Sequence, residues 1–447
     1  MSACIRTGLA LLALFIAVSS SAFEPDKQGR KDNPSVLFQN VRIFDGRVEA
    51  LREGSVLVEG SKIARISTSP LQPAPGTKIV EGGGRVMIPG LIDTHVHLAV
   101  TVGLELPFTD PWYLAIREAV EAERTLFRGF TTVRDMGGNV FAAKRAIDEG
   151  LVAGPRIYPS GAPLSQTSGH GDFRTSVEAH PRFGGYWPSA YREGNLILAD
   201  GVPEVLAATR EQLRRGASQI KLMAAGGVIS PSDPIDAKQY TPEELQAAVQ
   251  AAGDWNTYVA VHAYNAESIK RALHAGVKSI EHGNLIDEEA MKLVVEKGAV
   301  LSPQAAIFLR DIRLPPENMA KLNLVRAGLD TMFALAAKYR AKVTFGTDII
   351  GSLEEHARQN EEFGMRLKWF SPVEILRQAT STAAELLAMS GPRNPYPGKL
   401  GVIEEGAYAD LLVVNGNPLE DIRLLERPHE SLLVIMKNGQ LYKNLLH

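Results

Sequence analysis

The sequence predicts an α/β protein, a (β/α)8 TIM barrel with a small β-sandwich built from both chain ends. Along the middle of the 447-residue chain, short strand-like runs alternate with amphipathic helical segments. Eight such alternations are typical of a (β/α)8 barrel. Towards both ends, the short runs are instead broken by Gly, Asp, Asn and Pro, which is typical of a small β-sheet unit.

The predicted β-sandwich comprises residues 23–88 and 390–447, and the predicted barrel comprises residues 89–389. The first part of the sandwich contains strand-like runs at 35–38, 41–44, 54–59, 62–67 and 77–81, and the last part at 401–403, 409–414 and 432–439. Because the two parts share this texture, we expect them to pair with each other.

The barrel region supplies eight predicted strands and seven predicted helices. The strands are 91–97, 131–135, 156–160, 219–223, 258–262, 279–282, 299–302 and 342–348. The helices are 112–128, 141–149, 203–215, 242–255, 266–274, 288–297 and 318–340, with Thr241 as a cap of the fourth. Residues 166–201 form a long polar, aromatic and Gly-rich insertion, which we interpret as a lid or a wall of a substrate pocket.

Residues 1–22 resemble a secretory signal peptide. Arg6 precedes a short apolar core, and small residues follow it. The apolar core is shorter than the roughly 20 residues of a spanning helix, so we expect export to the periplasm or medium without a stable membrane anchor. The single cysteine, Cys4, lies in this segment, so the mature chain would have neither a disulfide nor a cysteine nucleophile. A net charge of −3 does not favour nucleic acid as a partner.

The first predicted barrel strand ends in two histidines spaced by two residues, His95 and His97. Side chains two apart on a strand point to the same side, so both imidazoles would face one point. Neutral imidazole is a good ligand for zinc and similar divalent ions. A His-X-His pair also occurs by chance, so the hypothesis that His95 and His97 bind a metal ion needs support from residues elsewhere in the chain.

Four further chemically capable residues fall on other predicted strands. They are Lys221, His262, His282 and Asp348. A barrel places its active site at the C-terminal ends of its strands. Taken alone, each residue has an ordinary interpretation as a rim histidine, a barrel ion pair or a helix cap. Six such residues on five strands together predict a metal site.

This set resembles the amidohydrolase superfamily in its binuclear-metal form. The resemblance rests on PGLIDTHVH at 89–97, the strand-four Lys221, the strand-end histidines and GTD at 346–348. It continues through ATSTAAEL at 379–386 and GKLGVIEEGAYADL at 398–411, and so covers most of the mature chain. The segments IKLMAAGG at 220–227, HAY at 262–264 and SGHGD at 168–172 look most similar to the prolidase-like and imidazolonepropionase-like branch, which includes ochratoxin amidohydrolases.

The resemblance implies two divalent metal ions, expected to be Zn2+, and a Lys221 carboxylated by CO2. One metal ion would take His95, His97, Lys221 and Asp348, and the other Lys221, His262 and His282. A hydroxide between the ions would be the nucleophile, and Asp348 would accept its proton and pass it to the leaving amine. A carbamate, unlike an ammonium, offers two oxygens that can bridge two cations.

His170, Tyr264 and Arg358 are the expected substrate contacts, the first two also with catalytic roles at the oxyanion or the substrate carboxylate. His170 has an alternative interpretation as a surface loop histidine, and Arg358 as part of a solvated helix start. His180 has no motif around it and is predicted to be an ordinary surface or core residue.

The expected function is hydrolysis of an amide or peptide bond next to a carboxylate. Small-molecule amides or short peptides would be substrates, so the enzyme would be a dipeptidase, a carboxypeptidase or an N-acyl amino acid amidase, including enzymes that act on aromatic amides such as ochratoxin. A cyclic amide hydrolase of the imidazolonepropionase type is the alternative. A non-catalytic relative would be expected to lack ligands, and none is missing. Relatives often form large assemblies, so we expect a homo-oligomer.

Overall fold

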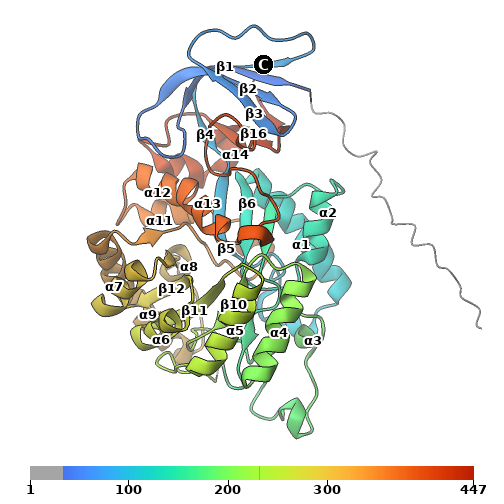
Figure 1. Cartoon of the computed structure of the whole chain (residues 1–447), viewed down its shortest axis with the longest axis vertical. Helices are drawn as coiled ribbons and strands as arrows, with labels where there is room; N and C mark the ends of the chain where they lie inside the picture. Colours follow the sequence, from blue (N-terminus) through green and yellow to red (C-terminus); the bar gives the residue numbers. More distant parts are fainter. Residues whose placement is uncertain (1–33, 231, 447) are drawn as a thin grey trace, which may run out of the picture. The chain divides into compact units, whose positions relative to one another are not determined.

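The computed structural model describes residues 34–230 and 232–446. The predicted signal peptide lies outside the described residues. Both ends of the described chain enter one seven-stranded sheet, ordered β17-β16-β15-β4-β1-β2-β3 (Figure 1). Its strands are β1 Val36–Ile43, β2 Arg52–Glu59, β3 Lys62–Ser67, β4 Lys78–Pro89, β15 Leu411–Val414, β16 Leu432–Lys437 and β17 Gln440–Asn444.

The long strand β4 joins the two ends of the chain within this sheet. One edge of β4 pairs in parallel with β1, and near its C-terminus the other edge pairs antiparallel with β15, with Pro89 opposite Leu411. The predicted pairing of the chain ends is therefore confirmed. The predicted β-sandwich is not, because the N-terminal and C-terminal strands extend one hydrogen-bonded sheet on either side of β4 instead of forming two stacked sheets.

All eight predicted barrel positions carry parallel strands. They are β5 Leu91–Val96, β6 Phe130–Asp135, β7 Arg156–Pro159, β10 Ile220–Met223, β11 Val259–Asn265, β12 Ser279–Leu285, β13 Val300–Ser302 and β14 Lys342–Val343. Two short strands lie inside and beside the insertion. The strand β8 Leu164–Ser165 pairs with β10, and β9 Ile197–Leu198 pairs with β8. The alternation of strand and helix read from the sequence is therefore confirmed.

The predicted closed barrel is not confirmed, because the described parallel strands form two hydrogen-bonded groups. One is β5-β6-β7 and the other is β14-β13-β12-β11-β10-β8-β9. The last predicted strand, 342–348, keeps regular pairing only at Lys342–Val343. Beyond it, single backbone hydrogen bonds reach β5, from Thr94 N to the Phe345 carbonyl (2.8 Å) and from Asp348 N to the His95 carbonyl (2.7 Å). These bonds hold the last strand beside the first without a regular ladder.

The seven predicted helices are all present, with shifts of a few residues at their ends. They are α1 Pro111–Phe127, α2 Phe141–Asp148, α4 Val202–Arg215, α5 Pro242–Asp254, α6 Ala266–Ala275, α7 Glu288–Glu296 and α9 Pro316–Tyr339. Thr241 caps α5 as predicted, since its side chain accepts from Glu244 N and the Glu244 carboxylate accepts from Thr241 N. The largest buried apolar cluster packs α4–α9 against β10–β13.

Several short helices were not predicted from the sequence. They are η2 Gly103–Phe108, η3 Pro181–Phe183, α3 Ser189–Arg192, α8 Ala306–Leu309, α11 Glu361–Arg366, α12 Pro372–Gln378, α13 Ser381–Ala388, η4 Gly391–Arg393, η5 Ile422–Glu426 and α14 Pro428–Ser431. A further short helix, α10 Leu353–His356, lies where a helix start was the alternative interpretation. The α12 helix begins with a capping box of Ser371 and Glu374, a signal that could be read from the sequence. Within the described residues, no helix is long and apolar enough to cross a membrane.

Candidate active site

Two histidines at the end of β5 and an aspartate beyond β14 form one cluster. The Nε2 atoms of His95 and His97 lie 3.3 and 3.0 Å from Oδ1 of Asp348. One ligand atom from each of the three residues lies within 4.8 Å of the others. This donor set suits a single divalent cation such as zinc.

Both histidines of the cluster are held by a hydrogen bond on their other ring nitrogen. His97 Nδ1 donates to the Gly137 carbonyl at 2.9 Å, and His95 Nδ1 lies 2.9 Å from Oε2 of Glu281. A proton on Nδ1 leaves the Nε2 lone pair free, and Nε2 faces Asp348 in both rings. Such outer contacts fix the tautomer and orientation of metal-binding histidines.

The buried pair of Glu281 and Arg134 supports His95. Arg134 donates from Nη2 to both carboxylate oxygens of Glu281, at 2.8 and 2.9 Å, and both side chains are fully buried. Burial would raise the pKa of Glu281, but the charge of Arg134 and the contact with His95 hold that pKa below its usual value. Glu281 therefore stays an acceptor. It carried no signal in the sequence beyond its place next to His282.

Lys221 on β10 is buried beside this cluster. Burial lowers the pKa of its amine to about 8, with Arg134 acting in the same direction and with Glu281 and Asp348 opposing it. A substantial neutral fraction near physiological pH is what reaction of an amine with CO2 requires. The environment of Lys221 therefore fits the carbamate that the resemblance implies.

His262 and His282 lie next to the first cluster. The ring centroids are 4.5 Å apart for His262 and His282, and 5.2 Å apart for His282 and His95. His282 Nδ1 donates to Gln304 Oε1 at 2.6 Å, and His262 Nε2 donates to the Gly226 carbonyl at 3.2 Å. Burial lowers the pKa of both rings, that of His282 to about 3. Each ring is therefore neutral, with one nitrogen free to act as a ligand.

Two of these residues have a backbone conformation that is rare outside glycine. The φ angles of His282 and Asp348 are 72° and 52°, both in the left-handed region. Non-glycine residues held there are concentrated at functional sites. Burial would raise the pKa of the Asp348 carboxylate, but His95 and His97 keep it well below its usual value.

The predicted substrate contacts His170 and Tyr264 both lie against His262. The His170 ring stacks on that of His262 with centroids 4.2 Å apart, and the Tyr264 ring meets it edge-on at 4.7 Å. His170 Nδ1 is 2.6 Å from Ser230 Oγ and 3.4 Å from a carboxylate oxygen of Asp233. Burial, helped by the negative charges of Asp348 and Asp233, raises the pKa of Tyr264 well above its usual value, so its hydroxyl remains a donor.

Arg358 has different surroundings from the other predicted residues. Its guanidinium pairs with Glu361 at 2.8 Å and with Glu355 at 3.7 Å, and its side chain is 39% exposed. The helical-segment alternative considered for this stretch agrees with its position just after α10. The structure therefore gathers the six predicted metal ligands, His170 and Tyr264, whereas Arg358 pairs with carboxylates of the helices on either side of it.

The family model described as the amidohydrolase family matches residues 86–441. The chain belongs to the amidohydrolase family. This amidohydrolase is 32% identical to ochratoxinase from Aspergillus niger over 421 residues, which cover 90% of this chain and 85% of ochratoxinase. The assigned family and this relative agree with the resemblance read from the motifs.

Solved structures support the same assignment. A prolidase complexed with N-methylphosphonate-L-proline is 38% identical to this amidohydrolase, with a TM-score of 0.84 and coverage of 92% of this chain and all of that one. A Xaa-Pro dipeptidase with methionine bound in its active site is 32% identical, with a TM-score of 0.78 and the same coverage. The chain is therefore a hydrolase of C–N bonds.

Proposed function

We propose that this amidohydrolase cleaves the amide or peptide bond next to a carboxylate in short peptides or N-acyl amino acids, with two bound zinc ions. The observation that carries the proposal is the cluster of His95, His97 and Asp348 beside the buried Lys221. The proposal is also supported by similar proteins named as a prolidase, a Xaa-Pro dipeptidase and an ochratoxinase.

The donor atoms divide into two sets. His95, His97 and Asp348 would hold one ion, His262 and His282 the other, and a carboxylated Lys221 would bridge both. The fit rests on the three converging ligand atoms and on histidines that burial keeps neutral. Bound divalent ions would supply a nucleophilic water at neutral pH and polarise the scissile carbonyl.

The protein's own groups would handle protons and charge. The Asp348 carboxylate would take the proton from the nucleophile and deliver it to the leaving amine. The Tyr264 hydroxyl, which burial keeps protonated, would donate a hydrogen bond to the oxyanion or to the substrate carboxylate. His170, held by Ser230 next to His262, would contact the same part of the substrate.

Aromatic side chains of the insertion favour a substrate with a large apolar group. Phe173 and Tyr186 are 40% and 92% exposed and belong to the segment that also carries His170. Together with the similarity to ochratoxinase, they support aromatic amides among the substrates. We also propose export after removal of residues 1–22, a division into a sheet domain of 23–88 and 390–447 and a (β/α)8-type domain of 89–389, and assembly into a homo-oligomer.

The test is amino acid release by the purified protein from a panel of dipeptides, N-acyl amino acids and aryl amides such as ochratoxin, with ring opening of cyclic amides measured in parallel. Release that disappears after chelation, returns with zinc and is absent in Lys221→Ala is the expected result. Hydrolysis confined to cyclic amides would favour the imidazolonepropionase-type alternative. Silence across the panel in a protein that binds no metal would refute the proposal.

A further inference from the structure

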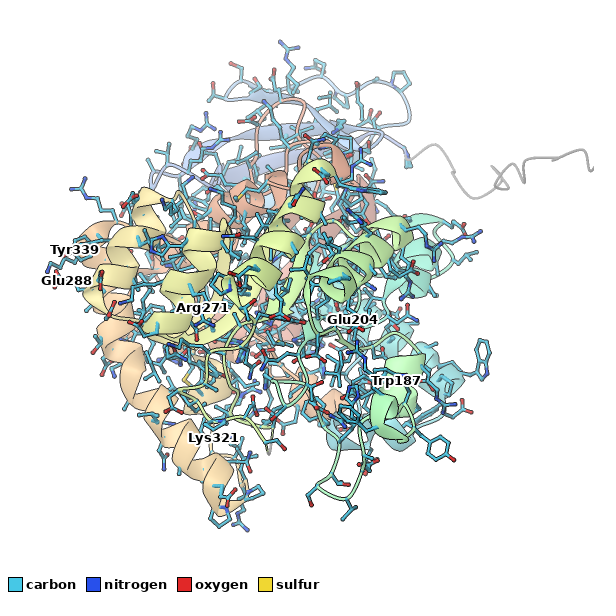
Figure 2. The ribbon with its side chains drawn as sticks, turned by 60° about the horizontal axis from the view of Figure 1, so that its bottom comes forward. Trp187, Glu204, Arg271, Glu288, Lys321 and Tyr339 are labelled. Atoms are coloured by element: carbon cyan, nitrogen blue, oxygen red, sulfur yellow. The ribbon has the colours of Figure 1, made fainter. Side chains whose placement is uncertain are left out.

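A cleft separate from the histidine cluster lies between the insertion and helix α4. His180, Arg182 and Trp187 line it from the insertion, and Glu204, Ala207 and Ala208 line it from α4. Figure 2 labels Trp187 and Glu204, which belong to these two walls. The cavity volume is about 180 Å³, close to that of an engineered cavity of ~150 Å³ that holds one benzene molecule. The space therefore fits a ligand with one ring or a branched aliphatic group.

His180 supplies an unused hydrogen-bond donor at this cleft. Its side chain is 7% exposed, and Nδ1 accepts a hydrogen bond from Arg182 N at 3.1 Å, capping the short helix η3. A neutral imidazole that accepts at Nδ1 carries its proton on Nε2. The Nε2 atom is buried and has no partner among the described residues. An unpaired buried donor costs free energy, which an acceptor on a ligand would recover.

The polar groups around the cleft suit a ligand that carries an ammonium group and a hydrogen-bond acceptor. Arg182 pairs with Glu204, and Asp200 adds a second carboxylate to the lining. With His180 neutral, two carboxylates oppose one guanidinium. An ammonium group on the ligand would face the two carboxylates, and an acceptor such as a carboxylate would pair with His180 Nε2.

The remaining lining is apolar. Trp187, Ile197, Leu198, Ala199, Ala207 and Ala208 supply it. These side chains would cover an aliphatic or aromatic group and remove it from water, which is favourable in proportion to the apolar area buried. A ligand with an ammonium group, a carboxylate and an apolar side chain would meet the two carboxylates, the His180 donor and the apolar lining together.

We propose that this cleft is a second binding site for a free α-amino acid with an apolar side chain. Its carboxylate accepts from His180 Nε2, its ammonium group faces Asp200 and Glu204, and its side chain packs against Trp187. Such amino acids are also products of the proposed hydrolysis, but the binding proposal does not depend on that reaction, and it stands or falls by a direct binding measurement.

The experiment is isothermal titration calorimetry of the purified protein with L-leucine and L-phenylalanine. A Lys221→Ala background removes the proposed catalytic carbamate and should leave binding at the cleft. 3-Phenylpropanoate, which lacks the ammonium group, and phenethylamine, which lacks the carboxylate, should each bind about tenfold more weakly or worse. Equal affinity for all of these probes would contradict the charge argument.

Substitutions at two positions, Ala207 and His180, place the binding event in the cleft. Ala207→Trp fills the space from an exposed position of α4 and should abolish binding, whereas the matched Ala207→Ser keeps the space and the affinity. His180→Phe should weaken binding about tenfold, and His180→Gln, which can still donate, should weaken it less. Thermal melts check folding, and Ala207→Trp suffices if His180→Phe does not fold. Binding that Ala207→Trp leaves unchanged, or no binding of either amino acid, overturns the proposal.

Discussion

Replacing Glu281 by Leu tests whether its buried carboxylate serves both the fold and the metal site. The change leaves the guanidinium of Arg134 fully buried without its carboxylate, and breaking such a pair costs about 3–5 kcal/mol. It also removes the acceptor from His95 Nδ1, 2.9 Å away. Loss of such an outer contact lowers metal affinity about 10–100-fold.

Arg134→Met is the matched control for this experiment. It breaks the same ion pair, so the metal-free protein should lose stability of the same order. Glu281 nevertheless remains next to His95, so zinc affinity should fall much less than in Glu281→Leu. The two variants therefore separate the role in folding from the role in holding the ligand.

The measurements are urea unfolding of the chelated proteins and zinc titration against a chromophoric chelator. Chelation keeps metal binding out of the stability comparison. Equal zinc affinities in the two variants would show that Glu281 acts only through the fold. A Glu281→Leu protein with the stability and zinc affinity of the wild type would refute the whole argument.

Three further predictions concern other parts of the chain. In Gly227→Ala the added Cβ would lie 1.9 Å from His170 Nδ1, so the His170 ring must move. The kcat/KM for amide hydrolysis should therefore fall about 10-fold or more, with Ala225→Gly as the control. Lys321→Met removes an ammonium group that donates to the backbone carbonyls of Gly227, Ser230 and Asp233. Because this loop holds His170, the substitution should also lower kcat/KM, and unchanged kinetics would show that Lys321 does not position the loop. Burial lowers the pKa of Lys437 from 10.5 to about 8. Between these two pH values the unfolded chain binds more protons than the folded chain, so the free energy of unfolding should rise with pH by about 3 kcal/mol. Urea unfolding of Lys437→Met at pH 7 to 10 should show a smaller rise in the free energy of unfolding than the wild type. An equal rise in both proteins would refute this role of Lys437.

Regular periodicity explains why the strand and helix positions of the barrel region could be predicted. Each predicted strand is a short run that contains β-branched or other apolar residues, and each predicted helix has apolar residues at helical spacing. The end of the last strand could not be predicted in this way. Its conformation depends on single backbone hydrogen bonds to β5 and on the left-handed φ of Asp348, 52°. Sheet stacking is also invisible to local patterns, which is why a sandwich was expected where the strands form one sheet.

The metal ligands could be predicted because they are chemically distinctive residues at strand ends. The residues that hold them could not. Glu281 and Gln304 resemble any other polar residues in sequence, and their roles follow from bonds to His95 and His282 formed across the fold. His180 was expected to be ordinary for the same reason, because its capping bond and its unpaired Nε2 depend on tertiary structure.

The sheet shared by both chain ends has a consequence for synthesis. Strand β4 cannot gain its β15 neighbour until Leu411, the partner of Pro89, has been made. Roughly 320 residues separate the two, which corresponds to about 16–64 s of translation at ~5–20 residues per second. During that time β4 presents an open strand edge, a template for pairing with other chains. A circular permutant that begins at Leu411 would close this edge early, and should aggregate less while it is being made.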